Sequence, residues 1–379
     1  MRTKEEWSWC HNHQNLDLTN YPYNGMILIK VPKSSSTSSA AILLRLNYYW
    51  NCTIPWKRLQ FEHVYANSYT NTYHPNATFL YTTIRHPASR AISRIWFSKV
   101  STRMAILKGN RPDTNETALL SDITTDDKII HYLRHDDSYH YGSTSRGQGG
   151  LQLAYTVLDP PGKGIAPYSF YYENKPFDPE QAVQVRNPHG LLAYVQSVID
   201  DYHFIMVTER FDESVVAMGL LMGLTEDQMG DILVTSGRVS EFQYYQRKCK
   251  QMYKSPRNLS PAVRAFLDGD EYRAANYGDL LLHEASNQSL DLTIDQTIGR
   301  DRFDRALAKY RHLKQLAAER CRAETVQVCT DQGVLQKEEA VENCYFFKDL
   351  GCGYKCIDQM LLELKSENVT QDLFPQVES

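Results

Sequence analysis

The sequence of 379 residues lacks several features that would assign it to a common class of protein. It has no apolar run of roughly 18 residues, and its first twenty residues lack the apolar centre of a signal peptide, so we expect a soluble chain without a membrane span. It has no CxxC pair, which argues against a zinc site. The formal net charge of −4 excludes a generally basic surface, so nucleic acid is not an expected partner.

Cysteines and glycosylation sequons are plentiful by contrast. The chain has eight cysteines, five of them within the last 60 residues. Six N-x-S/T sequons begin at Asn51, Asn76, Asn115, Asn258, Asn287 and Asn368. Chance gives about two or three such sequons in a chain of this size. We therefore expect disulfides and a lumenal or secreted protein, and the alternative is buried free thiols with unmodified asparagines.

Alternating strand and helix patterns predict an α/β fold. The predicted strands are 25–32, 77–87 and 202–211, and the predicted helices are 36–50, 88–100, 212–224, 260–288 and 293–321. Between them, residues 101–150 are polar and predict a loop-rich region. Because long connections separate the strands, we expect a central parallel sheet flanked by helices, followed by a helical C-terminal part.

A lysine and a run of hydroxyl residues follow the first predicted strand. Lys33 precedes Ser34, Ser35, Ser36, Thr37, Ser38 and Ser39. The backbone N–H groups of a helix N-terminus bind phosphate, and hydroxyls and a mobile ammonium add further donors. No glycine occurs in this loop, so it differs from the GxxxxGK[ST] loop of nucleoside triphosphatases. The alternative is a serine-rich helix cap beside a solvent-exposed lysine.

A second anion-binding pattern follows the next predicted strand. Arg85 ends that strand, and Ser93 lies eight residues later, in the second turn of a helix that Pro87 can begin. A guanidinium and a hydroxyl from one strand–helix turn can hold a second phosphate. Taken alone, Arg85 is equally suited to an ordinary ion pair.

Together, the two patterns resemble a known family. The order K-[ST]-x-[ST]-[ST]-[TS], then R-[DNH]-P-x-x-R-x-x-S, is similar to the paired cofactor loops of sulfotransferases that use 3′-phosphoadenylyl sulfate (PAPS). The resemblance implies PAPS as co-substrate and no required metal. It implies a 5′-phosphosulfate loop formed by Lys33, Ser34, Ser35, Ser36, Thr37 and Ser38, and a 3′-phosphate site formed by Arg85 and Ser93. Ser35 stands where many members have glycine, so a positive φ there would cost free energy.

Two later stretches narrow the resemblance. The stretch "FIMVTERFDESVVAMGLLMGL" resembles a segment of Golgi carbohydrate sulfotransferases. The stretch "YRAANYGDLLLHEASNQSL" and the helix ending at Cys321 resemble galactose-3-O-sulfotransferases, which include cerebroside sulfotransferase, although Leu282 replaces an expected tyrosine. The resemblance covers about 26–100 and 203–325, and we expect acceptor recognition in the unmatched residues 101–200.

The family implies a fold, a location and an acceptor. We expect a P-loop-like sulfotransferase domain over 25–325, between an N-terminal segment (1–24) and a Cys-rich extension with a polar tail (326–379). The implied location is the Golgi lumen, and the implied acceptor is a galactose-containing glycan or glycolipid. Members of the family carry a membrane anchor, which we do not find in this sequence.

We expect the catalytic base at His63. Sulfuryl transfer to a sugar hydroxyl benefits from a base that removes the hydroxyl proton during in-line attack. In related uronyl 2-O and galactose 3-O enzymes a histidine precedes the 3′-phosphate arginine by about the 22 residues that separate His63 from Arg85. Glu62 either orients this histidine or is the base itself, and His74 is the second choice. Lys33 is expected to stabilise charge on the bridging oxygen as the sulfuryl group leaves.

Other interpretations stay open at this point. A glycosaminoglycan (uronyl) 2-O-sulfotransferase would share both loops and would need a basic groove, which 238–257 could supply unless that stretch is a solvated helix face. A P-loop kinase would need a Gly-Lys pair and Mg²⁺ ligands that we do not find. An inactive carbohydrate- or nucleotide-binding relative is disfavoured by the retained Lys33, Arg85 and Ser93.

One cluster of histidines and aspartates allows two interpretations. His135 and His140 stand near Asp136 and Asp137. These residue types suit a metal site, but the polar surroundings favour an acceptor-binding loop.

Overall fold

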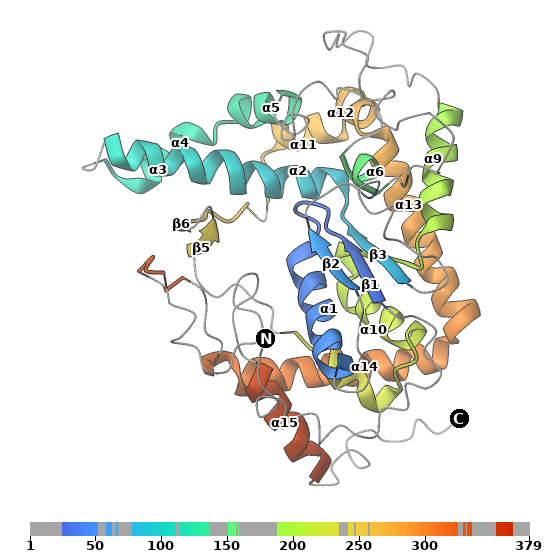
Figure 1. Ribbon diagram of the computed structural model, residues 1–379. Coiled ribbons are helices and arrows are strands. Elements are labelled where there is room, and N and C mark those ends of the chain that lie inside the picture. The colour runs from blue at the N-terminus through green and yellow to red at the C-terminus, as the bar shows by residue number, and fades with distance from the viewer. Residues whose placement is uncertain are drawn as a thin grey trace.

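A computed structural model gives the fold of the chain (Figure 1). The structure describes residues 25–51, 58–62, 66, 78–110, 114–135, 151–156, 158, 188–234, 242–245, 248–256, 258–324, 329–330, 332–335 and 354–366. Most of these residues are helical, and they surround a small sheet. The predicted α/β class is therefore confirmed.

The central sheet has four strands, and every pair is parallel. The strands are β1 (Gly25–Ile29), β2 (Arg58–Glu62), β3 (Thr78–Ile84) and β4 (Phe204–Val207), in the order β2-β1-β3-β4. All residues of β1, β3 and β4 are buried, which explains their nearly continuous apolar sequences. These three strands were predicted from the sequence, whereas β2 was not.

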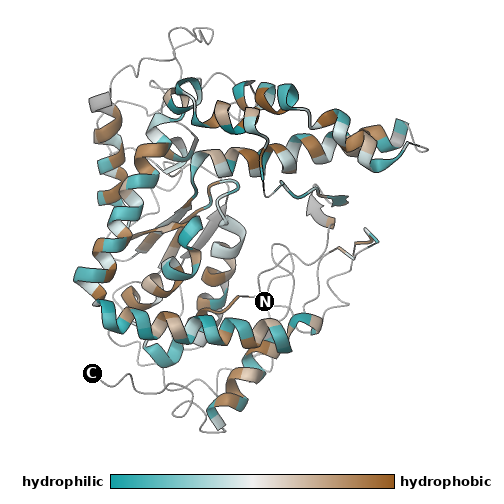
Figure 2. Ribbon diagram, turned by 180° about the vertical axis from the view of Figure 1, so that it is seen from behind, coloured by the Kyte–Doolittle hydropathy of each residue, from teal (hydrophilic) through white to brown (hydrophobic). Residues whose placement is uncertain are grey.

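Helices cover both faces of the sheet. Successive strand residues point to opposite faces, so Met26 and Leu28 pack in one core cluster while Ile27 and Ile29 pack in another. The first cluster includes residues of α1 (Ser36–Asn51), α10 (Phe211–Leu221), α14 (Arg300–Arg320) and α15 (Tyr354–Ser366). The second includes residues of α6 (Leu151–Thr156), α9 (Pro188–Asp201) and α13 (Tyr277–Leu292). In Figure 2 the hydrophobic colour accordingly gathers on the strands, while the outer helices alternate between both colours.

A third apolar cluster lies outside the sheet. It joins α2 (Pro87–Ile95), η3 (Trp96–Val100), α3 (Ser101–Asn110), α4 (Glu116–Ile123), α5 (Asp126–His135), α11 (Pro261–Asp268) and α12 (Asp270–Ala275). The chain runs from α2 through the π-helical turn η3 into α3 as one long helix (Figure 1). The prediction that 101–150 is loop-rich was wrong for 101–110 and 114–135, which are mostly helical. Buried residues such as Leu119, Ile123, Ile129 and Leu133 supply a narrow apolar face that the polar composition concealed.

Three further expectations need correction. The helix expected over 260–288 is divided into α11, α12 and α13, with breaks at Gly269 and Asn276. The helix expected over 293–321 begins as the π-helical turn η6 (Thr293–Ile298), and a break at Gly299, whose φ is 89°, separates it from the 21 residues of α14. Within 238–257 the described residues form an antiparallel hairpin, β5 (Phe242–Tyr245) and β6 (Lys248–Gln251), instead of a helix face. Its aromatic residues suit a strand.

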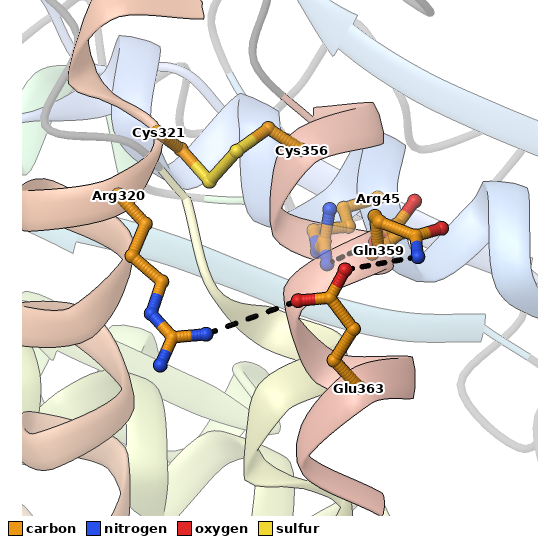
Figure 3. Close-up of a disulfide and its surroundings, with 7 residues drawn as sticks. Arg45, Arg320, Cys321, Cys356, Gln359 and Glu363 are labelled. Atoms are coloured by element: carbon orange, nitrogen blue, oxygen red, sulfur yellow. Dashed lines mark hydrogen bonds and ion pairs between the residues drawn. A yellow bond between two sulfur atoms is a disulfide. The ribbon is translucent and has the colours of Figure 1, made fainter. Parts of the chain in front are cut away.

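Disulfides are present, as expected. Cys249 pairs with Cys329, and Cys321 pairs with Cys356 (Figure 3). Every cysteine in the described part of the chain is thus in a disulfide. Among the described helices, none combines the length and the apolar character that a membrane span requires.

Candidate anion-binding site

The two predicted anion-binding loops lie together at one edge of the sheet. Because the strands are parallel, the loops after β1, β3 and β4 all leave from the carboxyl ends of the strands, and this is the edge of the sheet at which α/β proteins bind ligands. The Arg85 guanidinium Nη1 lies 3.5 Å from the carbonyl oxygen of Lys33, although 52 residues separate them in sequence. This contact joins the lysine loop to the arginine turn.

The lysine loop has a left-handed backbone at two positions. Lys33 has a φ of 66° and Ser35 a φ of 56°. Such a conformation costs a residue with a side chain about 1–2 kcal/mol. The glycine position of the resemblance therefore does have a positive φ here, and a serine occupies it. Strain of this kind is concentrated at functional sites.

Hydroxyl groups of the loop stabilise its shape. The buried Ser34 hydroxyl donates to the Val31 carbonyl over 2.8 Å. The Ser39 hydroxyl lies 2.6 Å from the Thr83 hydroxyl and thereby ties α1 to β3. Of the predicted loop serines and threonine, Ser34 and Ser36 are buried, whereas Ser35, Thr37 and Ser38 are half-buried. The last three are consequently the hydroxyls that a ligand could reach most easily.

The backbone of Arg85 is held by residues that the sequence analysis did not identify. Gln152 in α6 accepts from the Arg85 N–H and donates to the Arg85 carbonyl, both over 2.7 Å. The buried Asp279 carboxylate in α13 in turn accepts from the backbone N–H groups of Gln152 and Leu153, over 3.1 and 2.8 Å. This carboxylate caps the N-terminus of α6. These hydrogen bonds fix the position of the Arg85 backbone.

The guanidinium of Arg85 is held less firmly than its backbone. Its side chain is 29% exposed, and its buried Nε has no hydrogen-bond partner within the described part of the chain. Burial and the nearby charge of Arg90 lower the pKa of Arg85, and the charge of Glu209 only partly opposes them. A bound anion would relieve both effects, because it would accept hydrogen bonds and add negative charge.

Glu209 is another residue near Arg85 that was not predicted from the sequence. One of its oxygens accepts from the His86 N–H over 3.0 Å and lies 4.0 Å from Arg85 Nε, and the other lies 3.3 Å from His283 Nε2. Burial raises the pKa of Glu209, but the hydrogen bonds of His283 and His86 outweigh it, and the net pKa is lowered. Burial is the main cause that lowers the pKa of His86, and the charge of His283 is the next. The rings of His86 and His283 pack edge to face, with their centroids 5.2 Å apart.

The sequence carried a signal for three of the missed residues, Glu209, Asp279 and His283. Glu209 belongs to the stretch "VTERF", and Asp279 and His283 belong to "YGDLLLHEASNQ". Both stretches carry the family resemblance, but the resemblance assigned no role to these polar residues. Gln152 lies in the unmatched region, and no sequence pattern singles it out.

The remaining predicted residues have different outcomes. Ser93 lies half-buried on α2, the helix that begins two residues after Arg85. Glu62 ends β2, the neighbour of β1 at the same edge of the sheet. His63, His74, Asp136, Asp137 and His140 lie outside the described residues, and His135 ends α5. Among the side chains that the structure describes, no group of His, Cys, Asp and Glu could hold a metal ion.

Comparison of the chain with protein-family models and with curated proteins gave no match.

Proposed function

We propose that this protein is a PAPS-dependent sulfotransferase with a P-loop-like sulfotransferase fold. Its acceptor would be the 3-hydroxyl of a galactose on a glycolipid or glycoprotein, as the resemblance to galactose-3-O-sulfotransferases implies. The observation that carries the proposal is the contact between Arg85 and the Lys33 carbonyl, because it brings together two phosphate-binding patterns that are distant in sequence. Two phosphates of one nucleotide would need such proximity.

Each residue has a role in the proposed reaction. Arg85 and Ser93 would hold the 3′-phosphate, and the loop from Lys33 to Ser38 would hold the 5′-phosphosulfate. The acceptor oxygen attacks sulfur in line, the bond from sulfur to the bridging oxygen breaks, and adenosine 3′,5′-bisphosphate leaves. His63 would take the hydroxyl proton, and Lys33 would stabilise the charge that develops on the bridging oxygen.

The disulfides and sequons support a lumenal location. Cys249–Cys329 and Cys321–Cys356 suit an oxidising compartment, and the Golgi lumen is the compartment we propose. The sequons at Asn115 and Asn258 lie on exposed residues, which is compatible with glycans there.

Transfer of labelled sulfate from PAPS tests the proposal directly. Purified protein should label a β-galactoside, and Lys33→Ala should lower the rate of labelling about 10²–10³-fold. Preferential labelling of a uronate-containing polysaccharide would favour the 2-O-sulfotransferase alternative. Binding of adenosine 3′,5′-bisphosphate without transfer to any glycan would favour an inactive binding protein.

A separate substitution tests the assignment of the base. His63→Ala should lower kcat by about 10²–10⁴-fold, because a general base contributes about that factor. The affinity for adenosine 3′,5′-bisphosphate should not change, which calorimetry can verify. If the His63→Ala variant stays fully active, His63 is not the base, and Glu62 and His74 become the candidates.

A further inference from the structure

The side chain of Lys33 meets an aromatic ring that no sequence pattern singled out. The Lys33 ammonium Nζ lies 4.1 Å from the centroid of the Phe97 ring. Both residues are half-buried. An ammonium over an aromatic face is attracted by the ring quadrupole, and the attraction grows when water is partly excluded. The contact joins the lysine loop to the long helix at a point well beyond Arg85.

The position of Phe97 depends on a local irregularity of that helix. Phe97 lies in the π-helical turn η3, and such turns often occur at functional sites. The Ser101 hydroxyl donates to the Trp96 carbonyl over 2.8 Å, and it accepts from the Tyr253 N–H over 3.0 Å. Trp96 and Val100 are buried in the third apolar cluster. The turn is therefore anchored on both sides of Phe97, which holds the ring in place.

The ring also lies close to the proposed 3′-phosphate site. Phe97 follows Ser93 by four residues, and residues at this spacing neighbour each other on a helix surface. The Lys33 carbonyl meanwhile contacts the guanidinium of Arg85. Lys33 thus contacts the arginine turn through its backbone and the same helix through its side chain.

We propose that Phe97 is a positioning residue for Lys33. Its ring holds the ammonium at the edge of the site, charged and partly shielded from water, so that it can reach the bridging oxygen as the bond to sulfur breaks. The ring itself takes up no proton and makes no bond. This inference rests on the proposed sulfotransferase function, since it assigns a role to the lysine of that reaction.

Replacing the ring tests the inference. Phe97→Leu keeps an apolar side chain but removes the quadrupole, and it should lower kcat about three- to tenfold. The dissociation constant of adenosine 3′,5′-bisphosphate should stay within about twofold, because the phosphate contacts are untouched. Phe97→Tyr keeps the ring face and should keep most of the activity. Phe266→Leu is a matched control: Phe266 is also half-buried and holds Arg134 at 5.0 Å, and its loss should not change kcat.

A double-mutant cycle separates positioning from mere packing. If the ring acts through Lys33, Phe97→Leu should have no further effect on the residual rate of Lys33→Ala. Equal effects of Phe97→Leu in both backgrounds would overturn the inference. Incorporation of 3,4,5-trifluorophenylalanine at position 97 covers the case in which Phe97→Leu fails to fold, because it keeps the ring shape and weakens the quadrupole. An unchanged kcat for that protein would also overturn the inference.

Assays of the wild-type protein distinguish failure of the proposed function from failure of the role of Phe97. Absence of sulfate transfer and of nucleotide binding in the wild type would overturn the proposed function and this inference with it. An active wild type whose rate does not depend on the ring would overturn the role of Phe97 alone.

Discussion

Arg45 and Arg85 differ in how much of the side chain is buried and in how many hydrogen bonds the guanidinium makes. Arg45 in α1 is fully buried and donates to the Asp358 carboxylate over 2.7 Å and to the carbonyls of Asp231 and Gly230 over 3.1 and 3.4 Å. Arg85 keeps part of its side chain exposed, and within the described part of the chain its guanidinium makes only longer contacts, at 3.5 Å to the Lys33 carbonyl and 4.0 Å to Glu209. The Nε and Nη2 atoms of the first guanidinium donate to three protein oxygens, so we infer a structural role for Arg45. The second is positioned through its backbone, and its side chain is suited to a ligand.

The surroundings of Arg45 reinforce this contrast. The Cys321–Cys356 disulfide links the end of α14 to the start of α15, and Arg320 lies 3.9 Å from Glu363 (Figure 3). A Cβ at Gly230 would lie 2.6 Å from Leu361, so α15 packs directly on that backbone. The C-terminal helix is thus fixed by a covalent bond, by ion pairs and by close packing. The Arg85 region is held mainly by hydrogen bonds to Gln152.

The largest expected effect comes from removing Arg45. Arg45→Ala would leave the buried Asp358 carboxylate without its cation, and loss of one partner of a buried pair costs about 3–5 kcal/mol. Chemical denaturation should show a fall of this size in the free energy of unfolding. Arg134→Ala removes a more exposed pair with Glu271 and should cost less than about 1 kcal/mol. Equal losses for the two variants would contradict the structural role of Arg45.

Removal of Arg85 should affect substrate binding more than stability, the reverse of what we expect for Arg45. Arg85→Ala should raise the KM for PAPS about 10- to 150-fold, because a phosphate loses a charged partner worth about 1.5–3 kcal/mol. Its free energy of unfolding should change far less than that of Arg45→Ala. Steady-state kinetics and denaturation of the same preparations check both statements. A large loss of stability with an unchanged KM would make Arg85 a structural residue.

A smaller effect concerns Asp231, the neighbour of Arg45. Burial raises the pKa of Asp231 from 3.8 to about 6, although the charges of Lys365 and Arg45 oppose the rise and Asp358 adds to it. The folded state therefore retains a proton that the unfolded chain releases, and stability is lost as the pH rises between these values. Asp231→Asn should be more stable than the wild type by about 1–3 kcal/mol near pH 7.5.

The pH dependence makes the Asp231 prediction specific. The advantage of Asp231→Asn should shrink as the pH falls through 6 and vanish below 3.8, where both states of the wild type are protonated. Asp304→Asn, an exposed aspartate of α14, should leave the stability profile unchanged. An advantage of Asp231→Asn that does not depend on pH would show that the carboxyl is not protonated in the folded state.

The smallest expected effect concerns glycosylation. Asn115 is exposed at the N-cap of α4, whereas Asn287 is half-buried in α13 and donates to the His283 carbonyl over 2.9 Å. Expressed through a secretory pathway, Asn115→Gln should lose a glycan and migrate faster on gels, and Asn287→Gln should not. Loss of the Asn115 cap should also cost about 1 kcal/mol. A mobility shift for Asn287→Gln alone would contradict this assignment.

Local sequence patterns predicted most of the sheet, but they did not predict the polar residues that hold the turn at Arg85. β1, β3 and β4 are buried on both faces, so their apolar runs stand out, whereas β2 carries polar residues and was missed. Lys33, Ser35 and Arg85 were predicted because they lie in the turns between a strand and the next helix: Arg85 directly follows β3, and Lys33 and Ser35 lie between β1 and α1. Gln152, Glu209 and Asp279 act through contacts with segments 67 to 127 residues away, and no local spacing reveals such contacts.

Breaks within helices were also beyond local prediction. The π-turns η3 and η6 keep the apolar spacing of an ordinary helix closely enough to be hidden in the sequence. The position of Phe97 over Lys33 depends on one of these turns together with the left-handed backbone of the lysine loop. Neither feature follows from composition or periodicity.

Calorimetric titration can show whether the two loops hold two phosphates of one nucleotide. The wild type should bind adenosine 3′,5′-bisphosphate at least tenfold more tightly than adenosine 5′-monophosphate, because only the former reaches Arg85. Arg85→Ala should bind the two nucleotides with nearly equal affinity. Equal binding of both nucleotides by the wild type, or a preference that survives in Arg85→Ala, would contradict the claim.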